Sequence, residues 1–147
     1  MNLDSHCSDL YQSYFSLTQK ILLECPSEEL LVDAINQLKY PIASHTISNT
    51  PIFNYANEAM LKLFEMKHHE FIGLPSHQSA SPKHQEERGH LLAQVKLRGF
   101  VENYQGYRVK KNGDTFLIKK ATVWNVLNRL GEMHSQAVII FDWQDYC

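Results

Sequence analysis

The last third of the chain limits the possible folds more than any other segment. Three runs there are rich in the β-branched and aromatic residues that favour strands; they are residues 100–111, 115–128 and 134–144. Asn112 and Gly113 between the first two runs tolerate the positive φ angles of a tight hairpin turn, and Gly131 lies in the second connection. Because strands joined by such short turns pair in antiparallel fashion, these residues predict a three-stranded meander.

Helical and extended patterns alternate in the rest of the chain. Apolar residues at helical spacing predict a first helix from Ser8 to about Glu24, and Ser27 is expected to cap a second helix. Two strands, two short helical segments and one longer helix follow, at residues 40–48, 51–56, 58–66, 67–74 and 82–99. This order predicts an α+β fold with an antiparallel sheet of about five strands and short helices on one face. We expect an N-terminal helical extension at residues 1–39 before a domain at residues 40–147.

The stretch PIFNYANEAMLKLFEM, residues 51–66, places a strand directly against a helix. Its first residues have the aromatic and β-branched character of a strand, whereas Met60, Leu61 and Phe64 follow at helical spacing. Asn57 lies at the junction, where its side chain can accept a hydrogen bond from a free amide of the first helical turn. We therefore expect Asn57 to cap the helix, and a functional polar contact at this junction is the alternative.

The overall charge argues against nucleic-acid binding, because 14 Lys and Arg are offset by 16 Asp and Glu, for a net charge of −2. The lysines that flank residues 112–114 are expected to protect a sheet edge. Cys7, Cys25 and Cys147 form no CxxC pair and no disulfide framework. The sequence shows neither a signal peptide nor an apolar run that could span a membrane. These features predict a cytoplasmic location without membrane attachment.

Five segments, at these separations, resemble the MEKHLA domain, a PAS-like family; they are PIFNYANEAMLKLFEM, LPSHQSA, GFVENYQGYRV, FLIKKATVWNVLN and QAVIIFDW. A PAS domain begins with two strands, continues through short helices and one longer helix, and ends in a three-stranded meander, which is the order predicted here. In plants this domain ends the class III homeodomain–leucine zipper regulators, and in bacteria it also occurs as a stand-alone chain of about this length. The present chain resembles the stand-alone bacterial type, because it contains no homeodomain and no leucine zipper.

The resemblance implies a sensory or protein-interaction module and not an enzyme. Signalling would proceed through a homodimer or through a protein partner in trans. A regulatory domain that binds a small molecule is the first alternative. The second alternative is a small enzyme that uses His45 or His77 with a tyrosine as an acid–base pair, although no catalytic motif supports it.

The resemblance also implies a cavity between the concave face of the sheet and the short helices, for a small apolar or aromatic ligand. The candidate lining residues are Phe53, Phe64, Phe71, Leu91, Val95, Tyr104, Phe116, Ile118, Trp124 and Gln136. Alternation along the strand places Trp124 on the same face as Phe116 and Ile118, with Lys120 in line. A lysine there indicates a bulge, a rim position or a buried charge partner. The alternative is that these side chains fill the space themselves.

An apolar stripe along the first helix is the candidate contact for a second copy or another protein. Its members recur every three or four residues; they are Leu10, Tyr14, Leu17 and Ile21, and Cys7 extends the stripe backwards. The stripe is too short to form a stable coiled coil by itself. The alternative is that it packs against the sheet of its own chain.

The eight histidines do not predict a metal or haem site. His68 and His69 are adjacent, so on a helix they point about 100° apart. His84 and His90 are six residues apart and therefore miss a common helical face. The chain has no cysteine between residues 26 and 146, which excludes the cysteine–flavin photochemistry of light-sensing PAS relatives. We expect no haem, flavin or metal, and we expect His45 to be a hydrogen-bonded structural residue.

Overall fold

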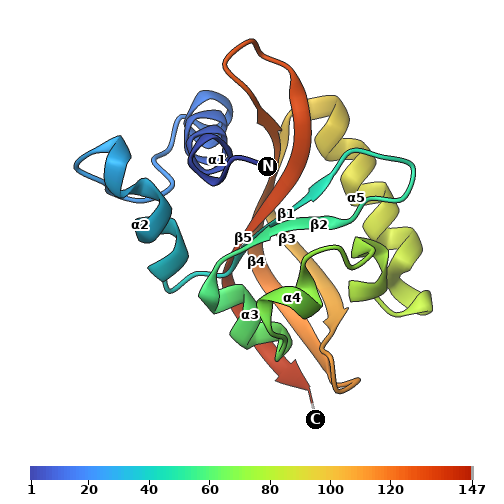
Figure 1. Ribbon diagram of the computed structural model, residues 1–147. Coiled ribbons are helices and arrows are strands. Elements are labelled where there is room, and N and C mark those ends of the chain that lie inside the picture. The colour runs from blue at the N-terminus through green and yellow to red at the C-terminus, as the bar shows by residue number, and fades with distance from the viewer. Residues whose placement is uncertain (147) are drawn as a thin grey trace.

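The computed structural model describes residues 1–146, so Cys147 lies outside the described residues. A sheet runs through the middle of the molecule, with helices on both sides (Figure 1). The α-helices are α1 (Leu3–Thr18), α2 (Leu31–Gln37), α3 (Glu58–Phe64), α4 (His68–Phe71) and α5 (Gln85–Arg98). The strands are β1 (Ile42–Thr46), β2 (Phe53–Ala56), β3 (Phe100–Val109), β4 (Thr115–Leu127) and β5 (Met133–Tyr146). Short 3₁₀ helices are η1 (Glu28–Leu30), η2 (Ser76–Ser79) and η3 (Pro82–His84).

The sheet has five strands in the order β2-β1-β5-β4-β3, and every neighbouring pair is antiparallel. β3, β4 and β5 form the predicted meander. Gly113 and Gly131 adopt φ angles of 92° and 80° in its two turns, a conformation that glycine adopts without steric cost. The predicted α+β fold with an antiparallel five-stranded sheet is therefore confirmed.

Helices cover both faces of the sheet. The short helices α3 and α4 and the longer α5 share one face, where Phe71 and Phe116 lie in the core. α1 and α2 cover the other face, seen on the left in Figure 1, and enclose a second core that contains Leu10, Ile35 and Trp124. A sheet with apolar residues on both faces must be covered on both, so the N-terminal helices are part of the folded core.

α1 lies several residues closer to the N-terminus than the sequence pattern predicted. Asn2 begins the helix, and its side chain accepts a hydrogen bond from the Ser5 N–H at 3.1 Å. Gln19 ends it in the left-handed conformation, with φ of 63°, and donates its N–H to the Phe15 carbonyl. Glutamine is not a residue type that signals this conformation, so the sequence did not reveal the end of the helix. Ile21 therefore falls beyond the helix and is 58% exposed.

A bulge in β4 changes which of its residues face which helices. The pairing of β4 with β5 shifts register on both sides of Lys120. Of the three explanations offered for this lysine, the β-bulge is therefore confirmed. Before the bulge, Phe116 and Ile118 belong to the core under α3–α5. After it, Val123 belongs to that core, whereas Trp124 lies in the core under α1. The prediction that Trp124 shares a face with Phe116 is wrong, because the extra residue reverses the alternation.

Asn57 caps α3 as predicted and also connects three elements. Its Oδ1 accepts hydrogen bonds from the N–H groups of Met60 at 3.0 Å and Ile42 at 2.9 Å. Its Nδ2 donates to the carbonyls of Ile35 at 3.0 Å and Tyr40 at 2.9 Å. The side chain is completely buried, so this one amide ties α2 and the start of β1 to the start of α3.

Candidate functional site

A cavity of about 70 Å³ lies between the sheet and the helices α3–α5. Aromatic rings form much of its apolar wall. Phe53 stacks on Phe71 with ring centroids 4.2 Å apart, and Phe64 meets Phe71 edge-on at 5.6 Å. Other apolar lining residues include Met60, Leu91, Ile118, Val123 and Ile140. The volume is small, with room for roughly five water-sized groups.

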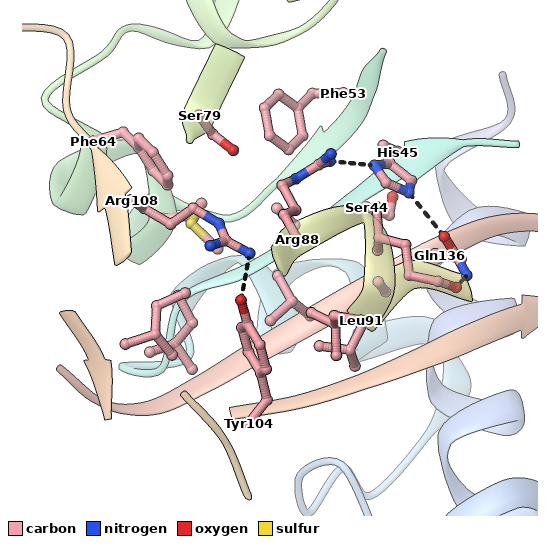
Figure 2. Close-up of a pocket in the computed structure, with 18 of the residues that line it drawn as sticks. Ser44, His45, Phe53, Phe64, Ser79, Arg88, Leu91, Tyr104, Arg108 and Gln136 are labelled. Atoms are coloured by element: carbon pink, nitrogen blue, oxygen red, sulfur yellow. Dashed lines mark hydrogen bonds between the residues drawn. The ribbon is translucent and has the colours of Figure 1, made fainter. Parts of the chain in front are cut away.

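His45 belongs to a buried hydrogen-bond network in the cavity wall, and Figure 2 shows its bonds to Gln136 and Arg88. The Gln136 amide donates to the Leu92 carbonyl, so its oxygen faces His45 and accepts from the Nε2–H at 3.1 Å. The Nδ1 of His45 is therefore the acceptor, with the Ser76 hydroxyl at 2.7 Å and the Arg88 guanidinium at 3.3 Å. Burial lowers the pKa of His45 to about 4, while the bond to Gln136 acts in the opposite direction. His45 is thus a neutral, hydrogen-bonded residue at pH 7.

Two buried arginines line the same cavity from different elements. Arg88 projects from α5 and donates to the Ser76 hydroxyl at 2.7 Å. Arg108 projects from β3 and donates to the Tyr104 hydroxyl at 3.0 Å and to the Tyr107 carbonyl at 2.7 Å. Figure 2 shows Arg88 directed toward His45 and Arg108 directed toward Tyr104. The cavity therefore combines an apolar wall with two cationic groups.

The family model for the MEKHLA domain matches residues 4–145 of this chain. The chain belongs to the MEKHLA domain family. A comparison of this MEKHLA domain with proteins of curated function finds no match.

Solved structures of a PAS domain and of light-oxygen-voltage proteins share the fold of this MEKHLA domain. The PAS domain of a protein from Colwellia psychrerythraea gives a TM-score of 0.67 at 15% identity, covering 80% of this chain and 95% of that one. A light-oxygen-voltage domain studied with a flavin analogue gives 0.62 at 14% identity, covering 80% and 84%. An RNA-binding light-oxygen-voltage receptor gives 0.68 at 15% identity, covering 84% of this chain and 36% of the receptor. Identities this low establish the PAS-like fold alone.

The structure brings most of the predicted pocket residues of the MEKHLA domain together. The predicted residues that line the cavity are Phe53, Phe64, Phe71, Leu91, Tyr104, Ile118 and Gln136. Val95 and Phe116 lie in the surrounding core without lining the cavity. Trp124 is on the other face of the sheet, where its ring meets Tyr14 of α1 at 4.9 Å. Binding of a ligand by these residues stays a prediction.

Sequence reasoning missed both arginines, although each had a positional signal. Arg88 precedes Leu91 by three residues and Val95 by seven, so all three lie on the buried face of α5. Arg108 follows Tyr104 by four residues along β3, and alternation places both on the buried face. Charged side chains are rarely fully buried, so the residue type of both arginines gave no indication of an interior position.

The stripe of α1 packs on the sheet of its own chain. Leu10 and Tyr14 are buried there, and Leu17 is half-buried at its edge. His6 on α1 also bonds across the interface, with its Nε2 2.9 Å from the Ser44 hydroxyl of β1. Burial lowers the pKa of His6 to about 4, with the neighbouring His134 acting in the same direction. Leu10 and Tyr14 therefore pack against the sheet of their own chain, which was the alternative to a contact with a partner. These two residues are not available to a partner in this structure.

The described part of this MEKHLA domain contains no group of three or more His, Cys, Asp or Glu side chains arranged to hold a metal ion. Of the histidines weighed above, His84 stacks on Tyr107 with ring centroids 4.9 Å apart. His77 is exposed and does not line the cavity. Within residues 1–146, none of the helices combines the length and apolar character needed to cross a bilayer.

Proposed function

We propose that this MEKHLA domain is a sensory module whose cavity binds a small molecule and whose bound state is detected by a second copy of the chain or by another protein. The MEKHLA and PAS-like fold is typical of sensory domains. The observation that carries the proposal is the cavity itself, because an apolar space with a few convergent polar groups is the usual form of a ligand site. A ligand of roughly five non-hydrogen atoms fits its volume, so we propose neither flavin nor haem as the occupant.

β1 supports a route from the cavity to the surface. Alternation along this strand directs His45 into the cavity network and the hydroxyl of the neighbouring Ser44 toward His6 of α1. A ligand that moves His45 would therefore move the strand to which α1 is hydrogen-bonded. We propose that a partner contacts the outer side of α1, where Phe15 is 46% exposed, since Leu10 is already packed inside.

We propose no catalytic role for the chain. Sensory domains of the PAS and MEKHLA type are generally not enzymes. Both ring nitrogens of His45 are engaged in the wall network, and His77 lies outside the cavity, so neither is positioned as a free acid or base.

Native mass spectrometry of the freshly purified protein tests this function, because it reports bound mass and subunit number together. We expect a discrete added mass in the wild type and its loss in Phe64→Trp, since the larger ring would occupy the cavity. Phe15→Trp makes the same replacement on the exposed side of α1 and should retain the bound mass. Equal retention in both variants, or a wild type that carries no ligand and gains none from cell extract, would refute the cavity as a ligand site.

A further inference from the structure

The two arginines of the cavity lack an acidic partner. Arg88 is 9% exposed and Arg108 is 7% exposed, yet neither forms an ion pair with a carboxylate among the described residues. No aspartate or glutamate lines the cavity. Their hydrogen bonds go to neutral groups, namely the Ser76 hydroxyl, the His45 ring, the Tyr104 hydroxyl and a backbone carbonyl.

The Glu87 carboxylate lies close enough to favour the charged form of Arg88, but it forms no ion pair with either arginine. The Tyr104 hydroxyl donates to the Glu87 carboxylate at 3.0 Å, so Glu87 reaches Arg108 only through the phenol. Glu87 is also exposed, which leaves its charge largely screened by water. Among the described residues, the cavity lining therefore holds two arginines and no carboxylate.

Two buried cations side by side are costly to a fold. Desolvation disfavours each charge, and in low-dielectric surroundings each also repels the other. Burial lowers the pKa of Arg88 to about 10; the charge of Arg108 acts in the same direction, whereas Tyr104 and Glu87 act in the opposite direction. Buried charges in proteins are normally paired or hydrogen-bonded to an opposite charge. An anion that entered the cavity would offset this imbalance.

We propose that the cavity binds a small monocarboxylate, with its carboxylate held by Arg88 and Arg108 and its hydrocarbon part against Phe53 and Phe64. This inference rests on the proposed function and names the chemical class of its ligand. A planar guanidinium matches the two oxygens of a carboxylate and can donate to both.

The cavity selects this class by size and by polarity. A volume of about 70 Å³ admits roughly five non-hydrogen atoms, which corresponds to a carboxylate with a chain of two or three carbons beyond it. The rest of the wall is apolar, so a second charged or strongly hydrated group on the ligand would be desolvated without a partner. A short-chain monocarboxylate satisfies both conditions, whereas a dicarboxylate or inorganic phosphate does not.

Isothermal titration calorimetry of the full chain with propionate and butyrate tests the inference at constant ionic strength. Butanamide provides a neutral probe of the same shape, and phosphate provides an anion without a hydrocarbon part. We expect binding of the carboxylates and none of the two comparison compounds. Arg88→Met and Arg108→Met should each weaken binding by about tenfold or more, because a charge-assisted hydrogen bond is lost. Arg98→Met removes an exposed arginine from the same helix as Arg88 and should leave the affinity unchanged.

A second measurement keeps the inference testable without a ligand. In the absence of carboxylate, the urea midpoints of Arg88→Met and Arg108→Met should not fall below the wild-type value, because an uncompensated buried charge is replaced by an apolar chain of similar length. If both midpoints fall strongly and carboxylates do not bind the wild type, the arginines serve the fold and the inference is overturned. Equal binding of butyrate and butanamide, or equal weakening by Arg98→Met, would also overturn it.

Failure of this inference can be distinguished from failure of the proposed function. A neutral molecule found in the wild type by native mass spectrometry and absent from Phe64→Trp would leave the sensory cavity standing and refute only the anionic class of ligand. An empty wild type that also fails to bind propionate and butyrate would refute both.

Discussion

Replacing Asn57 by aspartate should destabilise the domain, although aspartate is normally as good a helix N-cap as asparagine. The reason is that the Asn57 amide is used completely. Its oxygen accepts two backbone N–H groups and its nitrogen donates to two backbone carbonyls, all at 2.9–3.0 Å. Aspartate keeps the oxygen that caps α3, but it places a second oxygen where the nitrogen donated to the carbonyls of Ile35 and Tyr40.

The magnitude follows from the groups that lose a partner. Two hydrogen bonds are replaced by two oxygen–oxygen contacts, and an unsatisfied buried group costs about 1–3 kcal/mol. The Ile35 carbonyl keeps a bond from the Leu38 N–H at 3.3 Å, which reduces its share of the loss. The negative charge of the aspartate at the start of α3 interacts favourably with the helix dipole and offsets about 0.3–1 kcal/mol of this loss. We therefore expect Asn57→Asp to lower the free energy of unfolding by about 3 kcal/mol.

Urea denaturation followed by circular dichroism measures this change, and the chain offers a matched control. Asn2 caps α1 at an exposed position, and among the described residues its side chain makes a single hydrogen bond, accepted from the Ser5 N–H. Asn2→Asp should therefore change stability by no more than about 0.5 kcal/mol. If Asn57→Asp were as mild as Asn2→Asp, Asn57 would be an ordinary cap and the bridging role described above would be wrong.

Three further predictions concern other parts of the fold. The free energy of unfolding should fall as the pH drops from about 6.5 to about 4. Burial holds the pKa values of His6 and His45 near 4, whereas the same side chains in the unfolded chain take up protons at higher pH. Each histidine should therefore contribute a loss of about 3 kcal/mol. Urea titrations across this range measure the loss, and His6→Gln should reduce it; an equal loss in that variant would contradict the assignment. Gly106→Ala should lower the free energy of unfolding, measured with heat or urea, by about 1–3 kcal/mol. The new β-carbon would lie 2.1 Å from the Tyr104 hydroxyl and displace it. An unchanged stability would refute this steric explanation. Leu10→Ala should cost about 3 kcal/mol equally at low and high protein concentration, since α1 packs on its own sheet, whereas a concentration-dependent loss would indicate a contact between copies.

Local patterns in the sequence predicted the order of helices and strands, the C-terminal meander and the cap at Asn57. These features depend on residues close together in the chain, such as the alternation of a strand or the Asn112-Gly113 turn. The same patterns predicted much of the apolar wall of the cavity, including Phe53 and Phe64. Apolar side chains on the inward face of a strand or helix are buried away from water, and the cavity lies among them.

The side of the sheet on which Trp124 lies was decided only by the tertiary structure. A bulge at Lys120 inserts one residue into the alternation, and its presence depends on how β4 pairs with β5. The end of α1 at Gln19 is similar, because Gln19 adopts a left-handed conformation that its residue type does not predict.

The sequence by itself thus determined the family, the order of elements and the position of the apolar faces, since these follow from short-range spacing and residue type. The tertiary structure alone decided that Arg88 and Arg108 face one small cavity, because α5 and β3 meet only after the chain has folded. Residue type favours water for an arginine, and only the packing of the whole domain can hold two of them inside.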